Sequence, residues 1–387
     1  MASREPELNR PRIEQLWERK LPLRDLAAWL PLAAASGLYR LGVGARHLYW
    51  RKNKRHAGVT TISVGNLTAG GNGKTPFTLF LASRMLSHGL RVAIVSRGYK
   101  RAPTKDRALL VADGGVMKIS PEEAGDEPTM LAKSFSGPIA VARRRIDGIE
   151  LLAKLGPLDA VILDDGFQHE RLDRDVDLLL VSNQRGFGNG WMLPAGPMRE
   201  PISSVRRADA IVLVNFGDQE SVLRPSELRK LSSRTILAAA IRPHSFLALD
   251  NGVWNEIPLG LAGRRVLAVS GLADASGFYA MLRDLDADLV GVFEYPDHYA
   301  YTSSDWQTIV NAMRDVDLVV TTEKDLVKLE RFPFPRDSLY ALRLEVIMEP
   351  ADAEALENLI LGRMNQRAAT RKRNELRRTV GGFPQWR

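Results

Sequence analysis

Apolar and polar residues follow one another in blocks whose lengths are typical of strands and helices. An apolar run at residues 59–64 precedes a glycine-rich turn and a helical pattern at residues 76–88, with Pro76 near its start and Gly89 at its end. Further apolar runs rich in β-branched residues predict strands at residues 90–96, 138–141, 159–163, 176–181 and 210–214. Because these runs lack polar alternation, we predict an α/β fold with a mostly parallel sheet and helices on both faces.

A second series of apolar runs begins near Arg264 and predicts strands at residues 287–293, 317–321 and 339–344. Between the two series, Pro243, Pro258 and several glycines interrupt the pattern within residues 235–262. We therefore predict a chain in four parts: an N-terminal segment at 1–57, a larger α/β domain at 58–240, a smaller α/β domain at 241–362, and a tail at 363–387.

An uncharged apolar stretch occupies residues 26–39, between Asp25 and Arg40. It is too short to cross a bilayer, because a spanning helix needs roughly 20 apolar residues. Basic and aromatic residues follow it and suit a helix lying in the lipid headgroup layer: Tyr39, Arg40, Arg46, Tyr49, Trp50, Arg51, Lys52, Lys54 and Arg55. Four glutamates in the preceding segment argue against a cleaved signal. We predict a membrane-associated segment, and the alternative is a helix packed on the protein's own core.

Composition narrows the possible chemistry. The 387 residues include no cysteine, which excludes thiolate nucleophiles, zinc–cysteine clusters, iron–sulfur sites and disulfides. The net charge of +8 is uneven: residues 1–60 hold twelve Lys/Arg against five Asp/Glu, residues 363–387 hold eight against one, and the middle is therefore acidic. This distribution suits an acidic body held at an anionic membrane surface. We expect no nucleic acid, because no recognition module accompanies the basic C-terminal run, for which a solvated tail is the alternative.

The turn after the first predicted strand has the residues of a phosphate loop. Its glycines allow backbone N–H groups to surround phosphate oxygens, and the following helix adds the positive end of its dipole. In this pattern the lysine reaches the β and γ phosphates and the threonine hydroxyl binds Mg²⁺. The strict pattern has glycine where this chain has Thr68, but other glycines supply the flexible positions. The predicted nucleotide-binding residues are Gly70, Gly71, Asn72, Gly73, Lys74 and Thr75.

Two carboxylates end a later apolar strand. Asp164 and Asp165 follow the run Val-Ile-Leu, the position at which phosphate-loop proteins place an acidic group beside Mg²⁺. With Thr75 they form the predicted metal site, and the alternative is a solvated Asp-Asp turn. Position 69, where dimer-type ATPases carry an additional lysine, is Ala69 in this chain, which argues against a switch ATPase.

By these residues the chain resembles the tetraacyldisaccharide 4'-kinases, the lipid A 4'-kinases of Gram-negative bacteria. The segments that carry the resemblance are VGNLTAGGNGKTP at 64–76, SRGY at 96–99, GDEP at 125–128, DDGFQH at 164–169, LPAGPMREP at 193–201, SGL at 270–272, YPDHYAY around Asp297 and His298, and TEKDLVK at 322–328. They cover roughly residues 24–350, and DDGFQH and GPMREP are far more specific than any phosphate loop.

The resemblance implies phosphoryl transfer from ATP, with Mg²⁺, to the 4'-hydroxyl of a tetraacylated glucosamine disaccharide 1-phosphate, forming lipid IVA at the cytoplasmic face of the inner membrane. It implies an active site between two α/β domains, and a general base at Asp126 assisted by His298. In such a pair the histidine would hold the carboxylate and make it a better proton acceptor. We predict that Asp126 lies in a loop. The alternative for Asp126 is a turn residue or helix cap without a catalytic role, and the alternative for His298 is a histidine of a surface loop.

Other residues complete the predicted site. Arg143 and Arg145, in a run with Arg144, suit a phosphorylated acceptor, and Arg97 and Tyr99 end the second strand, where ligands collect. We expect His169 to face the acceptor, unless it is hydrogen-bonded within its own turn. Arg199 and Glu200 are predicted to close on the nucleotide, and the alternative is a purely structural loop. Glu323, Lys324 and Asp325 are expected to lie on the nucleotide side. We expect a monomer.

Two other functions fit the phosphate loop. One is a kinase or ligase acting on a soluble metabolite. The other is a nucleotide-dependent switch or chaperone, which would hydrolyse ATP without an acceptor and bind a protein partner. Ala69 and the YPDHYAY segment argue against the switch.

Overall fold

The computed structural model describes residue 17 and residues 26–98, 107–217, 223, 225–231, 234–250 and 253–380. The first half of the chain forms α2 (Leu26–Lys52), β1 (Thr60–Asn66), α3 (Lys74–Ser87), β2 (Val92–Ser96), β3 (Leu109–Asp113), β4 (Val116–Met117), α4 (Pro121–Ala124), α5 (Asp126–Ser134), β5 (Ile139–Val141), α6 (Arg145–Ala153), β6 (Ala160–Asp164), β7 (Val176–Ser182), the 3₁₀ helix η2 (Ile202–Arg207) and β8 (Ala210–Phe216). The second half forms α7 (Pro225–Leu231), β9 (Thr235–Asp250), β10 (Val253–Ile257), β11 (Arg265–Ser270), α8 (Ser276–Asp284), β12 (Asp288–Glu294), α9 (Ser303–Ala312), η3 (Met313–Asp315), β13 (Leu318–Thr322), α10 (Glu323–Leu329), β14 (Leu339–Ile347) and α11 (Pro350–Val380).

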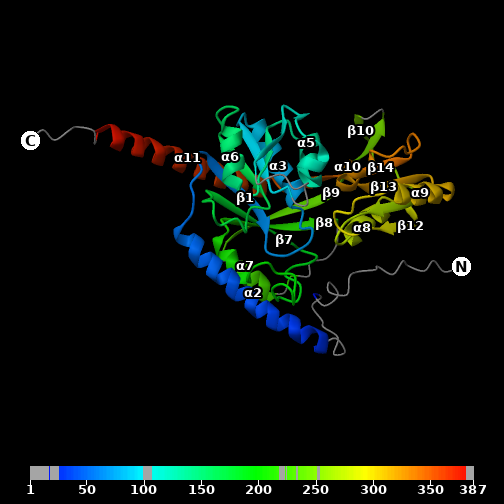
Figure 1. The fold of residues 1–387 in the computed structure, drawn as a ribbon, viewed down its shortest axis with the longest axis horizontal. Helices are drawn as coiled ribbons and strands as arrows, with labels where there is room; N and C mark the ends of the chain where they lie inside the picture. Colours follow the sequence, from blue (N-terminus) through cyan, green and yellow to red (C-terminus); the bar gives the residue numbers. More distant parts are fainter. Residues whose placement is uncertain are drawn as a thin grey trace, which may run out of the picture.

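The described strands form one sheet in the order β12-β11-β13-β14-β9-β8-β7-β1-β6-β2-β5-β3-β4, with β10 added to β9. Strand β1 pairs in parallel with β6 and β7, and every residue of these three strands is buried. Helices α3 and α5 pack on one face of the sheet, against residues such as Ile62 and Ile94. Helix α6 packs on the other face, against the alternate residues Ala93 and Val95, and α2 and α7 also cover that face (Figure 1). Strands buried on both faces need helices on both faces, so the predicted α/β class with a mostly parallel sheet is confirmed.

The sequence predicts an interruption of the strand pattern within residues 235–262, but the structure has a continuous strand, β9, over Thr235–Asp250. Its first part pairs in parallel with β8, and it pairs antiparallel with β14 as far as Ala248, so one strand joins both series of strands. Pro243 lies where the register with β14 shifts, and such a bulge tolerates a residue without a backbone N–H. The division into a domain at 58–240 and another at 241–362 stays a prediction.

Helix α2 lies along the body, with one face packed against the protein and the other exposed to solvent. Val43 and Ser36 are buried, the Ser36 hydroxyl donates to the carbonyl of Met192, and the Trp29 indole donates to the carbonyl of Ala195. The other face exposes leucines, with 73% of Leu38 and 71% of Leu41 accessible. Among the described helices, none is long and apolar enough to cross a membrane.

The predicted basic tail begins inside helix α11, which extends away from the body at its far end (Figure 1). Arg363 pairs with Asp209, and Arg367 pairs with Asp175, so the first residues of the tail are attached to the larger half of the sheet. The side chains of the basic run Arg371, Lys372, Arg373, Arg377 and Arg378 lie outside the described part of the chain.

Candidate active site

The phosphate loop connects β1 to α3 at the carboxyl edge of the sheet. Gly73 precedes the helix with φ +71°, and a Cβ there would lie 2.2 Å from Ile241 Cδ1, so only glycine fits without displacement. No side chain caps the first turn of α3, which leaves its backbone N–H groups available to an anion. Asn72 is buried, and its amide donates to the Thr68 hydroxyl at 2.9 Å. The loop therefore has the local geometry of a phosphate cradle.

Lys74 and Arg199 meet at Asp165, beside this loop. The Lys74 ammonium lies 3.7 Å from Asp165 Oδ1, and Arg199 Nη1 lies 2.9 Å from Asp165 Oδ2. Burial alone would raise the pKa of Asp165, but Lys74 and Arg199 outweigh it and hold that pKa well below its ordinary value. Arg199 also donates to the carbonyl of Thr68, so it is joined directly to the phosphate loop.

Asp164 is buried at the end of β6. The hydroxyls of Thr78 and Ser96 donate to its two carboxylate oxygens at 3.3 and 3.4 Å. Burial, followed by the charges of Glu127 and Asp165, raises the pKa of Asp164 to about 7. Asp164, Asp165 and Glu127 thus form a group of interacting carboxylates, and Asp165 lies at the Lys74 end of the loop. Carboxylate oxygens are hard ligands that suit Mg²⁺. Glu127 is a member of this group that the sequence analysis missed.

Asp126 and His298 are 172 residues apart in the chain and in contact in the structure. His298 Nδ1 lies 3.0 Å from Asp126 Oδ2, and the Lys328 ammonium lies 3.3 Å from the same oxygen. Burial would raise the pKa of Asp126, but the hydrogen bond from His298 and the charge of Lys328 together hold that pKa below its ordinary value. Asp126 is the first residue of α5 rather than part of a loop as predicted, and the charge of the adjacent Glu127 acts on Asp164. The residue that follows Asp126 therefore interacts with the strand end whose next residue, Asp165, contacts Lys74 of the phosphate loop.

Among the predicted acceptor residues, Arg97 and Arg143 are exposed, while Arg145 is buried. The Arg145 guanidinium donates to the carbonyls of Ala142 and Asp164, so in this structure it supports the end of β6 from inside. Tyr99 lies outside the described residues.

His169 is half-buried near this group of arginines. Burial, and then the positive charge of Arg145 and Arg174, lowers its pKa to about 3, so the imidazole is neutral at physiological pH. Arg97 contributes to the same shift, which places Arg97, Arg145 and His169 in one electrostatic neighbourhood.

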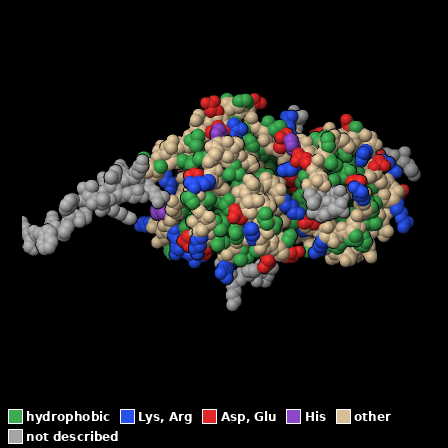
Figure 2. All heavy atoms as spheres, turned by 90° about the horizontal axis from the view of Figure 1, so that it is seen from above, with side chains coloured by type: hydrophobic (Ala, Val, Ile, Leu, Met, Phe, Trp, Pro, Cys, Tyr) green, Lys and Arg blue, Asp and Glu red, His purple; other side chains and the backbone are tan. Residues whose placement is uncertain are grey.

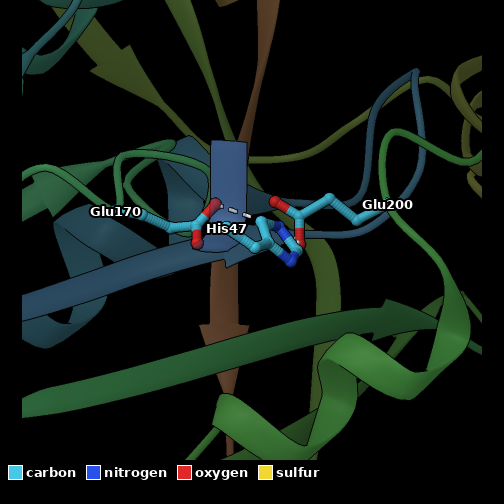
Figure 3. Close-up of side chains that lie close together, drawn as sticks. All are labelled: His47, Glu170 and Glu200. Atoms are coloured by element: carbon cyan, nitrogen blue, oxygen red, sulfur yellow. Dashed lines mark ion pairs between the residues drawn. The ribbon is translucent and has the colours of Figure 1, made fainter. Parts of the chain in front are cut away.

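Glu200 lies away from the nucleotide loop that its neighbour Arg199 contacts. Its fully buried carboxylate pairs with Arg207 at 2.7 Å, with Arg46 at 3.2 Å and with His47 at 3.3 Å, so it attaches α2 to the body. Burial would raise the pKa of Glu200, but the hydrogen bonds and charges of His47 and Arg207 lower it to about 2. Figure 3 shows His47 between Glu170 and Glu200. The three side chains are close enough to bind a metal ion, but Arg46 and Arg207 already supply the positive charge.

Replacement of Glu200 with glutamine is expected to destabilise the protein by about 2–4 kcal/mol, because it removes the fully buried carboxylate of an ionic network and leaves Arg46 and Arg207 with only the more distant Glu170. Urea unfolding followed by circular dichroism measures this change. Glu354, an exposed residue of α11, provides the control Glu354→Gln, which should leave the transition in place. Equal stability of both variants would show that the network is not an anchor of α2.

Phosphate loops serve hydrolases, ligases and kinases alike, so the neighbouring groups decide the class. A carboxylate and a histidine beside the loop suit a hydroxyl acceptor, which defines a phosphate-loop kinase. A family model described as "Tetraacyldisaccharide-1-P 4'-kinase" matches residues 28–365. The chain belongs to this family.

Known proteins agree with this membership. A tetraacyldisaccharide 4'-kinase of Syntrophus aciditrophicus is 36% identical over 383 residues, covering 92% of this chain and 98% of that protein. One from Geobacter sulfurreducens is 38% identical over 333 residues, covering 84% and 91%. The crystal structure of an "apo" form of LpxK from Aquifex aeolicus in complex with ATP has a TM-score of 0.69 and 32% identity, and covers 87% of this chain and 99% of that one.

Proposed function

We propose that this chain transfers the γ-phosphoryl group of ATP to the 4'-hydroxyl of tetraacyldisaccharide 1-phosphate, forming lipid IVA in lipid A biosynthesis. The observation that carries the proposal is the contact between Asp126 and His298, because a sugar hydroxyl needs a proton acceptor next to the phosphate that it attacks. Family membership supports this acceptor, and the ATP in the Aquifex aeolicus complex supports the donor.

The chain's own residues would divide the work as follows. The amides at the start of α3 and the Lys74 ammonium hold the phosphates, and Arg199 fixes Asp165 beside them. The 4'-oxygen attacks the γ-phosphorus as its proton passes to Asp126, the bond to ADP breaks in line, and no phosphoenzyme forms. His298 holds the accepting carboxylate in place. Thr75, Asp164 and Asp165 would hold Mg²⁺, which when bound would supply positive charge to offset the negative charge of the phosphates.

The lipid acceptor would approach between the two halves of the sheet. Charged and histidine side chains gather at the surface where these halves meet (Figure 2). Arg97, Arg143 and His169 are the residues we propose for the acceptor and its 1-phosphate, since arginine suits phosphate recognition. Arg145 would act indirectly, by holding the backbone of Asp164 in place through its hydrogen bond to the Asp164 carbonyl.

The function is tested by incubating the protein with labelled Mg-ATP and the disaccharide lipid in mixed micelles. Transfer of label to the lipid is expected, with mass spectrometry locating one added phosphate on the distal glucosamine. Soluble sugars and ATP without an acceptor serve as controls, since a metabolite kinase would label the former and a switch ATPase would release phosphate from the latter. Label that stays in ATP at every detergent ratio would contradict the proposal.

We propose further that α2 attaches the enzyme to the cytoplasmic face of the inner membrane without crossing it. Its outer face presents an apolar stripe beside the exposed Arg40, the arrangement of a helix at an anionic interface. Leu30, Leu38, Leu41 and Leu48 are each more than half exposed. Burial of this stripe in lipid would bring the phosphate loop close to a lipid acceptor.

Charges in this stripe should release the protein from vesicles. The double variant Leu38→Asp/Leu41→Asp is expected to float with anionic phospholipid vesicles far less than the wild type, because aspartate cannot enter the acyl layer and repels anionic lipid. The control Leu155→Asp/Leu361→Asp changes two exposed leucines elsewhere and should float normally. Equal flotation of both variants, with unchanged thermal unfolding, would contradict attachment through α2.

A further inference from the structure

Arg185 lies against the phosphate loop, although neither its sequence context nor the predicted mechanism assigns it a role. It follows β7, the strand that pairs with β1 on the side opposite β6, so it lies at the same carboxyl edge as the loop. Its Nη1 atom is 2.6 Å from the position that a Cβ on Gly70 would occupy. The guanidinium therefore packs onto the flexible glycine of the phosphate loop, and about a third of the side chain is accessible to solvent.

The other side of the guanidinium contacts the second half of the sheet. Arg185 Nη2 lies 2.6 Å from Asp274 Oδ2, in the segment between β11 and α8. Asp274 is held in place by its other oxygen, which accepts from the backbone N–H and the hydroxyl of Ser276. Arg185 thus contacts the phosphate loop through Nη1, and it contacts Asp274, a fixed carboxylate of the other half of the sheet, through Nη2.

Charge compensation distinguishes Arg185 from the other cations at the loop. Lys74 and Arg199 both pair with Asp165, which belongs to the same half of the sheet and lies beside the predicted metal site. Arg185 instead pairs with a carboxylate outside that site. A triphosphate in the loop would bring several negative charges to Gly70, and guanidinium groups bind phosphate oxygens with two parallel hydrogen bonds. Phosphate oxygens and Asp274 would then compete for the same donors.

We propose that Arg185 is a nucleotide-binding residue that contacts the β or γ phosphate of ATP and that Asp274 competes with the nucleotide for it. This proposal rests on the proposed function, because it takes the triphosphate to be bound by the loop. It has a consequence that a structural ion pair would not have: removal of the arginine weakens ATP binding, whereas removal of the competing charge at Asp274 strengthens it.

The test measures dissociation constants of Mg-ATP and of AMP by calorimetry on the full chain, without lipid. Arg185→Gln is expected to weaken ATP binding by about 10- to 100-fold, as for loss of a charge-assisted hydrogen bond, and to leave AMP binding unchanged. Asp274→Asn keeps the oxygen that Ser276 uses and is expected to tighten ATP binding by about two- to fivefold. Arg91→Gln breaks an Arg–Asp pair at the opposite edge of the sheet and is the matched control.

Three outcomes would overturn the proposal. If both variants bound ATP more weakly, the pair would be a structural bridge between the halves. If Arg185→Gln bound ATP normally, the guanidinium would not reach the phosphates. If Arg185→Gln lost AMP and ATP binding equally, or lost its thermal transition, the effect would be on the fold. The variant Arg185→Lys, which keeps the charge, checks this: after a loss of fold, it should restore ATP binding no more than AMP binding. A wild-type chain that bound no ATP would instead refute the proposed function itself.

Discussion

Replacement of Asp126 with asparagine should lower kcat by about 10²- to 10⁴-fold, the range measured when a general base is removed. The amide cannot accept the proton of the sugar hydroxyl, while its shape preserves the start of α5 and the contact with His298. Initial rates at saturating ATP and lipid measure the effect. The dissociation constant of ATP should hardly change, because Asp126 pairs with His298 and Lys328 rather than with residues of the phosphate loop.

The control for Asp126→Asn is Glu122→Gln, which removes an exposed carboxylate from the neighbouring helix α4. Its rate should equal that of the wild type. Should Asp126→Asn also turn over at a near-normal rate, Asp126 would not be the base, and the role of His298 as its support would fall with it.

Replacement of Lys74 with methionine is expected to lower turnover by about 10²- to 10³-fold, comparable to the loss of one donor that stabilises developing charge. Methionine keeps much of the length of the lysine side chain, so the packing of the loop against β9 should survive. Removal of the ammonium also takes away one of the three cations that lower the pKa of Asp165. Steady-state kinetics and ATP binding, measured together, separate lost affinity from lost catalysis.

Lys154→Met is the matched control for Lys74, because Lys154 is exposed at the end of α6. Wild-type kinetics are expected for this variant. If Lys74→Met retained most of its kcat at saturating ATP, the ammonium would serve only to bind the nucleotide and would make no contact specific to the transition state.

The phosphate loop could be predicted from sequence because its geometry is local. Glycines, a lysine and a helix start within a dozen residues are sufficient, and Gly73 and Lys74 lie where the pattern predicts. Asp164 and Asp165 were found for the same reason, since the end of an apolar strand defines their position. The sheet edge then gathers these residues by topology alone.

Residues brought together by tertiary contacts were beyond such reasoning. The contact between Asp126 and His298 spans both halves of the chain, and only a family resemblance pointed to it. Arg145 was predicted to face a phosphate, yet α6 begins at this residue, while Arg144 before it has extended backbone. The exact start of the helix decides which arginine of the run is buried, and helix boundaries are the least certain part of a sequence-based prediction. Glu200 was assigned with Arg199, but neighbours in a loop contact different partners, and the partner of Glu200 is α2.

Strand β9 has a mechanical consequence. A linker between two bodies would let them swing freely, but here a sixteen-residue strand is hydrogen-bonded to β8 in one half and to β14 in the other. Any movement of His298 toward or away from the nucleotide must therefore twist the continuous hydrogen-bonded sheet around β9. The hydrogen bonds of β9 resist this twist. Heat should then melt both halves in a single cooperative transition rather than one after the other.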